Sequence, residues 1–206
     1  MSFYGLSIYF IAFTNIILFV SFQLFFDYKS KRELDLYTES QEMSERLARL
    51  LADHSKQNLK IGTKRNYNGK VAYTGKLLKR EGVIIFDEDL YKSLTENQFN
   101  CLVMHEYSHF IHIDQTKMTF SFIFIILLYV NTFLFVLNFF FRANNFLLIV
   151  VASMLLLVEI LSIPLVAPKV LKAISEHLEN RADKYASIKV KEGCMKEFRE
   201  THEIIP

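Results

Sequence analysis

The residues best suited to chemistry are His105, Glu106 and His109, which together form an HExxH motif. On a helix the two histidines lie one turn apart on the same face, so both imidazoles can bind one metal ion. Zinc suits two neutral imidazoles and a carboxylate, with a fourth position left for water. Glu106 projects about 100° round the helix from His105, where it can act as a general base on that water. Chance alone produces the motif in roughly one chain of this length in a hundred. The residues around the motif must therefore show whether it forms a metal site.

Those surroundings predict a helix. Thr95 and Gln98 have the types and spacing of a capping box, which marks a helix start. An apolar stripe at helical spacing then follows, formed by Phe99, Leu102, Val103 and Phe110. The motif therefore lies on a well-defined helix of about fifteen residues. Cys101 falls within it, and we expect a buried free thiol there rather than a disulfide.

Three long apolar runs hold most of the hydrophobic residues, which make up 51% of the 206-residue chain. They are Phe3–Phe26, Met118–Phe141 and Phe146–Ala167, and we expect each to span a membrane as a helix. The second and third runs predict a transmembrane hairpin, which Pro164 and Pro168 are expected to end. The formal net charge of +2 is too small and too dispersed to indicate a nucleic-acid partner.

One acidic residue, Glu159, interrupts the third apolar run. An acid inside a membrane is a functional candidate by default. The alternative, which we favour, is a structural role in which Glu159 bonds to Asn15, Asn131 or Asn138 on a neighbouring helix, since those side chains also need partners in lipid.

Basic residues indicate the orientation in the membrane. Clusters of lysine and arginine mark the cytoplasmic side of a span, which places the N-terminus outside and the motif helix inside. The composition, rich in Lys, Asn, Ile and Phe and without Trp, is typical of a bacterium, and hence of a bacterial cytoplasmic membrane. The clusters that agree on this orientation are Lys29, Lys31 and Arg32 after the first run, Lys117 before the hairpin, and Lys169 and Lys172 after it.

These features divide the chain into four parts. Residues 1–28 form an N-terminal transmembrane segment, and residues 29–117 a cytoplasmic half-domain with the motif helix. Residues 118–168 form the hairpin, and residues 169–206 a cytoplasmic helix with a tail. The predicted fold class is an α+β membrane protein with three transmembrane helices and one small cytoplasmic domain.

The half-domain is predicted to begin with a helix over residues 38–60. Thr38 and Gln41 are predicted to form a capping box at its start. Its buried face is expected to contain Met43, Leu47, Leu50 and Leu51. His54 on this helix is interpreted as a partly buried or surface histidine, because it has no carboxylate or histidine at metal-ligand spacing.

Short strands are predicted next, over Leu59–Gly62, Val71–Thr74 and Gly82–Phe86, with Asn66–Gly69 as a turn. The last strand is the most apolar and should be the most buried. The strand Val71, Ala72, Tyr73, Thr74 has two open interpretations. As an edge strand it could hold an extended peptide by main-chain hydrogen bonds, or it could simply shelter the motif helix.

A second charged segment after the hairpin completes the candidate site. Glu179 and Asp183 lie one turn apart on a predicted helix. A two-histidine zinc site needs a third protein ligand, for which Glu179 is the best candidate. Asp183 would then lie behind the ligands and orient a histidine through its other ring nitrogen. The alternative is an ordinary solvated charged helix, which the HExxH motif elsewhere in the chain makes less favourable.

Together the two motifs resemble those of the HtpX-like integral-membrane zinc metallopeptidases, relatives of the CAAX prenyl endopeptidase. That family pairs HExxH with the pattern S-x-x-x-E-x-x-A-D-x-x-A, often with a transmembrane hairpin between them. The likeness covers about residues 40 to 190 and implies a gluzincin-type domain. It also implies that His105, His109 and Glu179 bind one zinc ion and that Glu106 is the general base. The matching residues of the second motif here are Ser175, Glu179, Ala182, Asp183 and Ala186.

The predicted function is a zinc metalloendopeptidase that cuts membrane proteins or hydrophobic peptides at the cytoplasmic membrane surface. For the group that steadies the oxyanion, the local candidates are His177, Arg181 and His202. Two alternatives are a protease-like signal transducer, similar to the beta-lactam sensors, and a catalytically silent membrane scaffold. The sequence shows no separate sensor domain, and the intact motif residues argue against a scaffold.

Overall fold

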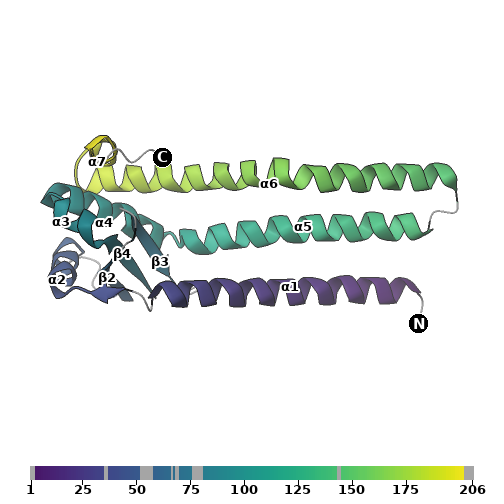
Figure 1. Cartoon of the computed structure of the whole chain (residues 1–206), viewed down its shortest axis with the longest axis horizontal. Helices are drawn as coiled ribbons and strands as arrows, with labels where there is room; N and C mark the ends of the chain where they lie inside the picture. The colour runs from purple at the N-terminus through teal and green to yellow at the C-terminus, as the bar shows by residue number, and fades with distance from the viewer. Residues whose placement is uncertain are drawn as a thin grey trace. The chain divides into compact units, whose positions relative to one another are not determined.

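The computed structural model describes residues 3–34, 37–51, 58–65, 67, 70–75, 81–142 and 145–201. The chain is mostly helical with one small sheet, so the predicted α+β class is confirmed (Figure 1). It divides into two compact units. Unit 1 comprises Met1–Phe25 and Met118–Ser175, and unit 2 comprises Phe26–Lys117 and Glu176–Pro206.

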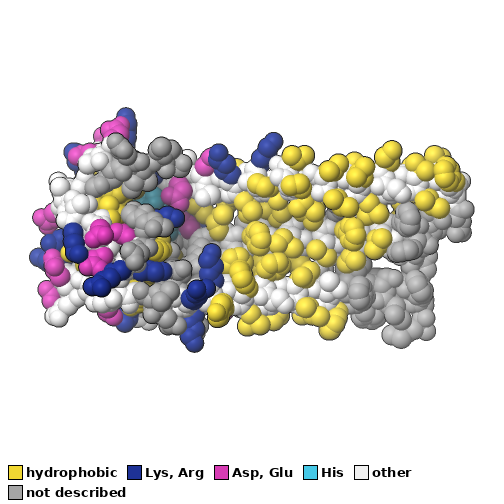
Figure 2. Space-filling view, viewed as in Figure 1, with side chains coloured by type: hydrophobic (Ala, Val, Ile, Leu, Met, Phe, Trp, Pro, Cys, Tyr) yellow, Lys and Arg dark blue, Asp and Glu magenta, His cyan; other side chains and the backbone are white. Residues whose placement is uncertain are grey.

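Unit 1 is made from the apolar parts of three helices, α1 (Phe3–Leu34), α5 (Asp114–Arg142) and α6 (Phe146–Lys189). Figure 2 shows hydrophobic side chains covering much of its visible face. Among the described residues, α5 and α6 are long and apolar enough to cross a membrane, by length and composition. Two spans are thus supported, and the third, in α1, stays a prediction.

Polar and aromatic pairs join α1 to α5 within unit 1. The Asn15 side-chain amide donates a hydrogen bond to Oδ1 of Asn131 at 2.9 Å, and the Asn131 amide in turn donates to the Leu127 carbonyl at 2.7 Å. The two asparagines therefore bond to each other, and the expected bond between Glu159 and Asn15, Asn131 or Asn138 stays a prediction. The Glu159 side chain lies outside the described part of the structure.

Helix α6 continues through both of its prolines to Lys189, so Pro164 and Pro168 do not end the helix, and the end of the third span there stays a prediction. A long helix tolerates proline where neighbouring groups satisfy the freed carbonyls. As a consequence, the third apolar run and the segment with Glu179 and Asp183 form a single helix.

The sheet of unit 2 contains β1 (Thr38–Glu39), β2 (Asn58–Lys64), β3 (Val71–Gly75) and β4 (Glu81–Asp87) in the order β1-β2-β4-β3. The three predicted strands are confirmed. The predicted turn between β2 and β3 does not make them partners, because β4 lies between them, parallel to β2 and antiparallel to β3.

The position of β4 follows from its side chains. Residues 83–86 are almost completely buried, and a strand that is apolar on both faces is most stable in the middle of a sheet. This arrangement leaves β3 as an edge strand beside the motif helix. Of the predicted turn, Asn66, Asn68 and Gly69 lie outside the described residues.

The first helix of unit 2, α2 (Gln41–Leu50), is shorter than predicted. Its N-cap is Ser40, whose hydroxyl accepts a hydrogen bond from the Met43 amide. The predicted cap Thr38 belongs instead to β1, where it pairs with Thr63. His54 lies outside the described residues. A further short helix, α3 (Glu88–Ser93), is capped by Asp87 and was not predicted.

The motif helix, α4 (Glu96–Ile111), has the predicted Thr95–Gln98 capping box and ends at His112. It packs against β3, β4 and the last helix, α7 (Cys194–Thr201). The motif is therefore held against the hydrophobic core of unit 2. Fully buried side chains of this core include Met43, Ile61, Ile84, Phe86, Phe99, Tyr107 and Phe110.

A disulfide joins Cys101 of α4 to Cys194 of α7, so in this structure Cys101 is not the free thiol that we had expected. The two residues are 93 positions apart in sequence, with helices α5 and α6 between them. No local pattern could pair them, because only the packing of α7 on α4 brings them together.

Candidate metal centre

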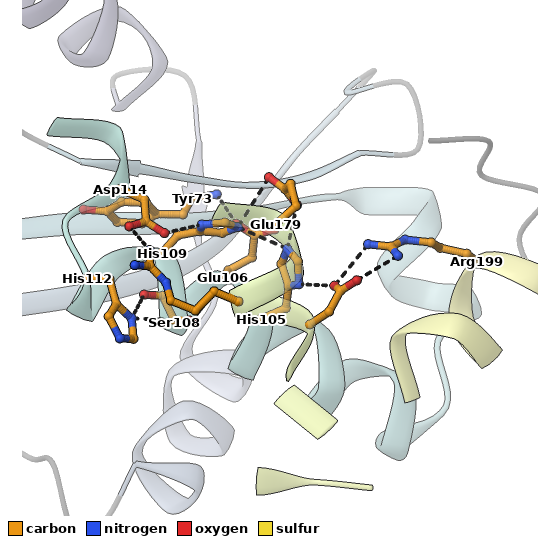
Figure 3. Close-up of polar contacts among 11 residues, drawn as sticks. Tyr73, His105, Glu106, Ser108, His109, His112, Asp114, Glu179 and Arg199 are labelled. Atoms are coloured by element: carbon orange, nitrogen blue, oxygen red, sulfur yellow. Dashed lines mark hydrogen bonds and ion pairs between the residues drawn. The ribbon is translucent and has the colours of Figure 1, made fainter. Parts of the chain in front are cut away.

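Three side chains from two helices converge in unit 2, as Figure 3 shows. His105 and His109 come from α4, where their Nε2 atoms lie 3.1 Å apart. Glu179 comes from α6, with one carboxylate oxygen 3.2 Å from Nε2 of His105 and the other 3.6 Å from Nε2 of His109. The structure thus brings together the three residues predicted as metal ligands.

The spacing of these atoms fits a tetrahedral metal ion. A zinc ion with bonds of about 2.0–2.1 Å places its ligand atoms about 3.4 Å from one another. The three separations here lie close to that value. The site is also open on one side, because the Glu179 side chain is 49% exposed whereas that of His105 is 5% exposed. A fourth position facing solvent is what a catalytic site requires.

An aspartate lies behind each histidine. Oδ1 of Asp183 is 2.9 Å from Nδ1 of His105, and Oδ2 of Asp114 is 2.9 Å from Nδ1 of His109. A carboxylate at Nδ1 holds the ring so that Nε2 faces the metal position. The location of Asp183 agrees with the sequence interpretation. Asp114 was missed, although its place just after the end of the motif helix was a usable signal.

An arginine in turn contacts each aspartate. Arg181 of α6 pairs with Asp114, and Arg199 of α7 pairs with Asp183. Arg181 is thereby engaged, which argues against its predicted role at the oxyanion. Of the other candidates for that role, His177 is exposed and His202 lies outside the described residues. No sequence pattern pointed to Arg199.

The motif glutamate is held by the edge strand. Glu106 is 8% exposed, and its Oε2 accepts a hydrogen bond of 2.7 Å from the Tyr73 amide of β3. The Tyr73 ring also packs edge-on against Phe110, one turn after Glu106 on α4. One carboxylate oxygen is therefore fixed, and the other has no such main-chain partner among the hydrogen bonds of the described residues.

The same hydrogen bond defines the direction of the groups on β3. Its donor, the Tyr73 N–H, points away from β4, towards α4. In an antiparallel ladder the residues alternate between bonding to the partner and facing outward. Val71, Tyr73 and Gly75 therefore direct their main-chain groups to the free edge, while Ala72 and Thr74 bond to β4.

Comparison with known proteins agrees with this geometry. The family model "Peptidase family M48" matches residues 37–202, a range that contains both motifs. The chain belongs to peptidase family M48. This confirms the family resemblance that the two motifs indicated. No curated protein matches the chain.

Among solved structures, the crystal structure of S. mikatae Ste24p resembles this M48 chain with a TM-score of 0.67 and 17% sequence identity. The match covers 90% of this chain and 49% of Ste24p, so the chain spans about half the length of that protein. At this identity the likeness concerns the fold. Family membership and apolar helices together support a membrane metallopeptidase.

The charges around the M48 histidines also favour a bound cation. Burial alone would lower the pKa of both histidines, but nearby carboxylates outweigh it and raise the pKa above the usual 6.5. For His105 these carboxylates are Asp183 and Glu179, and for His109 they are Asp114 and Glu179. The same contacts hold the pKa of Glu179 far below its usual value. A metal ion that binds here replaces the protons that this acidic environment attracts.

Proposed function

We propose that this chain is a zinc metalloendopeptidase that cuts membrane proteins or hydrophobic peptides at the membrane surface. The observation that supports this best is the spacing of His105, His109 and Glu179, which fits tetrahedral zinc, with the Glu106 carboxylate on the same helix. Two imidazoles and one carboxylate are a donor set typical of catalytic zinc. When bound, the ion would act as a Lewis acid and lower the pKa of water at the site.

The roles of the chain's own residues follow from their positions. His105, His109 and Glu179 hold the ion. Glu106 takes a proton from the attacking water through its free oxygen and then delivers it to the leaving amine. Its other oxygen stays on the Tyr73 amide, which keeps the carboxylate in place throughout. The burial of Glu106 limits competing contacts with bulk water.

The free edge of β3 offers a binding site for the substrate main chain. Outward-facing groups of Val71 and Gly75 flank Tyr73, whose amide already contacts Glu106. An extended peptide that pairs with this edge would run past the catalytic carboxylate. Such pairing uses main-chain hydrogen bonds, so it predicts an extended substrate segment without a fixed side-chain sequence.

Membrane proteins and hydrophobic peptides are the proposed substrate class because of helix α6. It carries Glu179 and, without interruption, the apolar segment proposed to span the bilayer. A ligand on a membrane helix beyond its apolar part is expected close to the bilayer surface. Substrates that reside in or near the bilayer therefore meet the site most often.

The proposed side of the membrane is cytoplasmic, as the positive-inside rule predicts from the basic residues that flank the apolar runs. The Cys101–Cys194 pair bears on the same question, because a reducing compartment keeps cysteines as thiols. For a cytoplasmic unit 2, we therefore expect both cysteines to be reduced in growing cells and to form the bridge only on oxidation.

Thiol labelling tests this orientation. Cells are quenched with acid, and free thiols of the denatured protein are alkylated. The mass of the labelled protein is then measured by mass spectrometry and compared with that of a sample that was chemically reduced before alkylation. Two labels before reduction are expected. If labels appear only after reduction, the bridge exists in the cell and the cytoplasmic orientation is contradicted, while the proposed enzymatic activity is unaffected.

The activity itself is tested by metal removal. Detergent-purified protein is expected to contain about one zinc per chain and to cleave fluorescein-labelled casein. A chelator should abolish cleavage, and added Zn²⁺ should restore it. Protein that binds no zinc even after reconstitution would contradict the proposal and favour the scaffold alternative.

A further inference from the structure

Helix α7 brings Arg199 to the outer side of the metal centre (Figure 3). Its guanidinium contacts both oxygens of Asp183, with Nη1 2.8 Å from Oδ2 and Nη2 3.1 Å from Oδ1. That same Oδ1 lies 2.9 Å from Nδ1 of His105. Arg199 is thus linked to a proposed metal ligand through one carboxylate.

This two-point contact controls the orientation of the Asp183 carboxylate. The planar guanidinium matches a carboxylate with two parallel N–H···O bonds, which fix its plane as well as its position. A lysine would supply the charge but not the plane. With the carboxylate fixed beside it, Nδ1 of His105 is the ring nitrogen that favours the proton, and the lone pair of Nε2 is left to face the metal position.

Helix α7 is packed firmly enough to hold Arg199 in position beside Asp183. Cys194, Met195 and Phe198 are buried in the core of unit 2, where α7 packs on the motif helix. Arg199 follows Phe198 directly, so its backbone is anchored by that packing. The side chains of Arg199 and Asp183 are 36% and 24% exposed, and this partial shielding from water strengthens their interaction.

We propose that Arg199 is a positioning residue of the metal centre, which orients His105 by holding Asp183. The inference rests on the proposed function, since it takes His105 as a metal ligand. On the other side of the centre, Arg181 contacts Asp114 behind His109. Arg181 lies on the same helix as Glu179, whereas Arg199 comes from a separate helix, so Arg199 can be replaced without altering the helix that supplies the third ligand.

Zinc affinity tests this role in the full chain. Detergent-purified protein is titrated with Zn²⁺ in competition with a colorimetric chelator. Arg199→Ala is expected to weaken zinc binding by about 10- to 100-fold. Arg199→Lys should recover part of this loss, because an ammonium keeps the charge without the paired contact. Arg65→Ala, which removes an exposed arginine from an ion pair with Glu88, is the matched control and should bind zinc like the wild type.

A double variant tests whether Arg199 acts through Asp183. Asp183→Ala should weaken zinc binding, and adding Arg199→Ala to it should cause no further loss, because the link to His105 is already absent. A further tenfold loss in the double variant would overturn the proposed route. Wild-type affinity in an Arg199→Ala protein that melts like the wild type would overturn the role altogether.

Cobalt provides a readout that a purely structural role would not change. Visible absorption of bound Co²⁺ depends on ligand orientation, so Arg199→Lys should alter the band shape while its melting temperature stays near that of the wild type. If Arg199→Ala does not fold, an unchanged Co²⁺ spectrum and zinc affinity in Arg199→Lys overturn the proposal. A wild type that binds no zinc overturns the proposed function too, whereas unaffected variants of a zinc-binding wild type overturn only the positioning role.

Discussion

Glu106→Gln is expected to lower peptidase activity by about 10²- to 10⁴-fold while zinc content stays at the wild-type level. Glutamine is close to glutamate in shape, and its carbonyl oxygen can still accept the Tyr73 N–H. The edge strand and the motif helix should therefore keep their contact. What glutamine lacks is the ability to take a proton from water, so the loss should appear in the chemical step rather than in folding or metal binding.

The measurement is cleavage of labelled casein by wild type and variant, with zinc content determined on the same samples. Glu96→Gln is the matched control, because Glu96 is an exposed glutamate in the first turn of the same helix. It should cleave at the wild-type rate. A zinc-replete Glu106→Gln protein as active as this control would rule out Glu106 as the general base.

The features read correctly from sequence are those that depend on neighbouring residues. The spacing of His105 and His109 places them on one helix face whatever the rest of the chain does. The Thr95–Gln98 box likewise starts α4 through contacts within one turn. The roles predicted for Glu179 and Asp183 depended on the assumption that their helix lies against the motif helix. The family resemblance supported that assumption.

The features that sequence reasoning missed depend on distant packing. The buried β4 takes the centre of the sheet because of how much apolar surface it covers, which overrides the order along the chain. The Cys101–Cys194 bridge and the contact of Arg199 with Asp183 both require α7 to return to the motif helix after the hairpin. Thr38 was misread because Ser40 offers an equally good cap two residues later.

The third ligand gives the other large expected effect. Glu179→Ala should reduce zinc from about one ion per chain to almost none and should abolish casein cleavage. Loss of an outer partner of a metal ligand costs about 10- to 100-fold in affinity, so loss of a ligand itself should exceed that range. The protein should still fold, because the Glu179 side chain is half exposed and lies outside the hydrophobic core.

His177→Ala is the informative control for this prediction. His177 lies two residues before Glu179 on the same helix, is exposed, and could bind zinc by its chemistry, yet it is not part of the ligand group. Zinc content by mass spectrometry should therefore stay at the wild-type level in His177→Ala and fall only in Glu179→Ala. The opposite pattern would show that the metal is held by a different residue of α6. Zinc retained in both variants would mean that the two motif histidines recruit a third ligand from outside this helix.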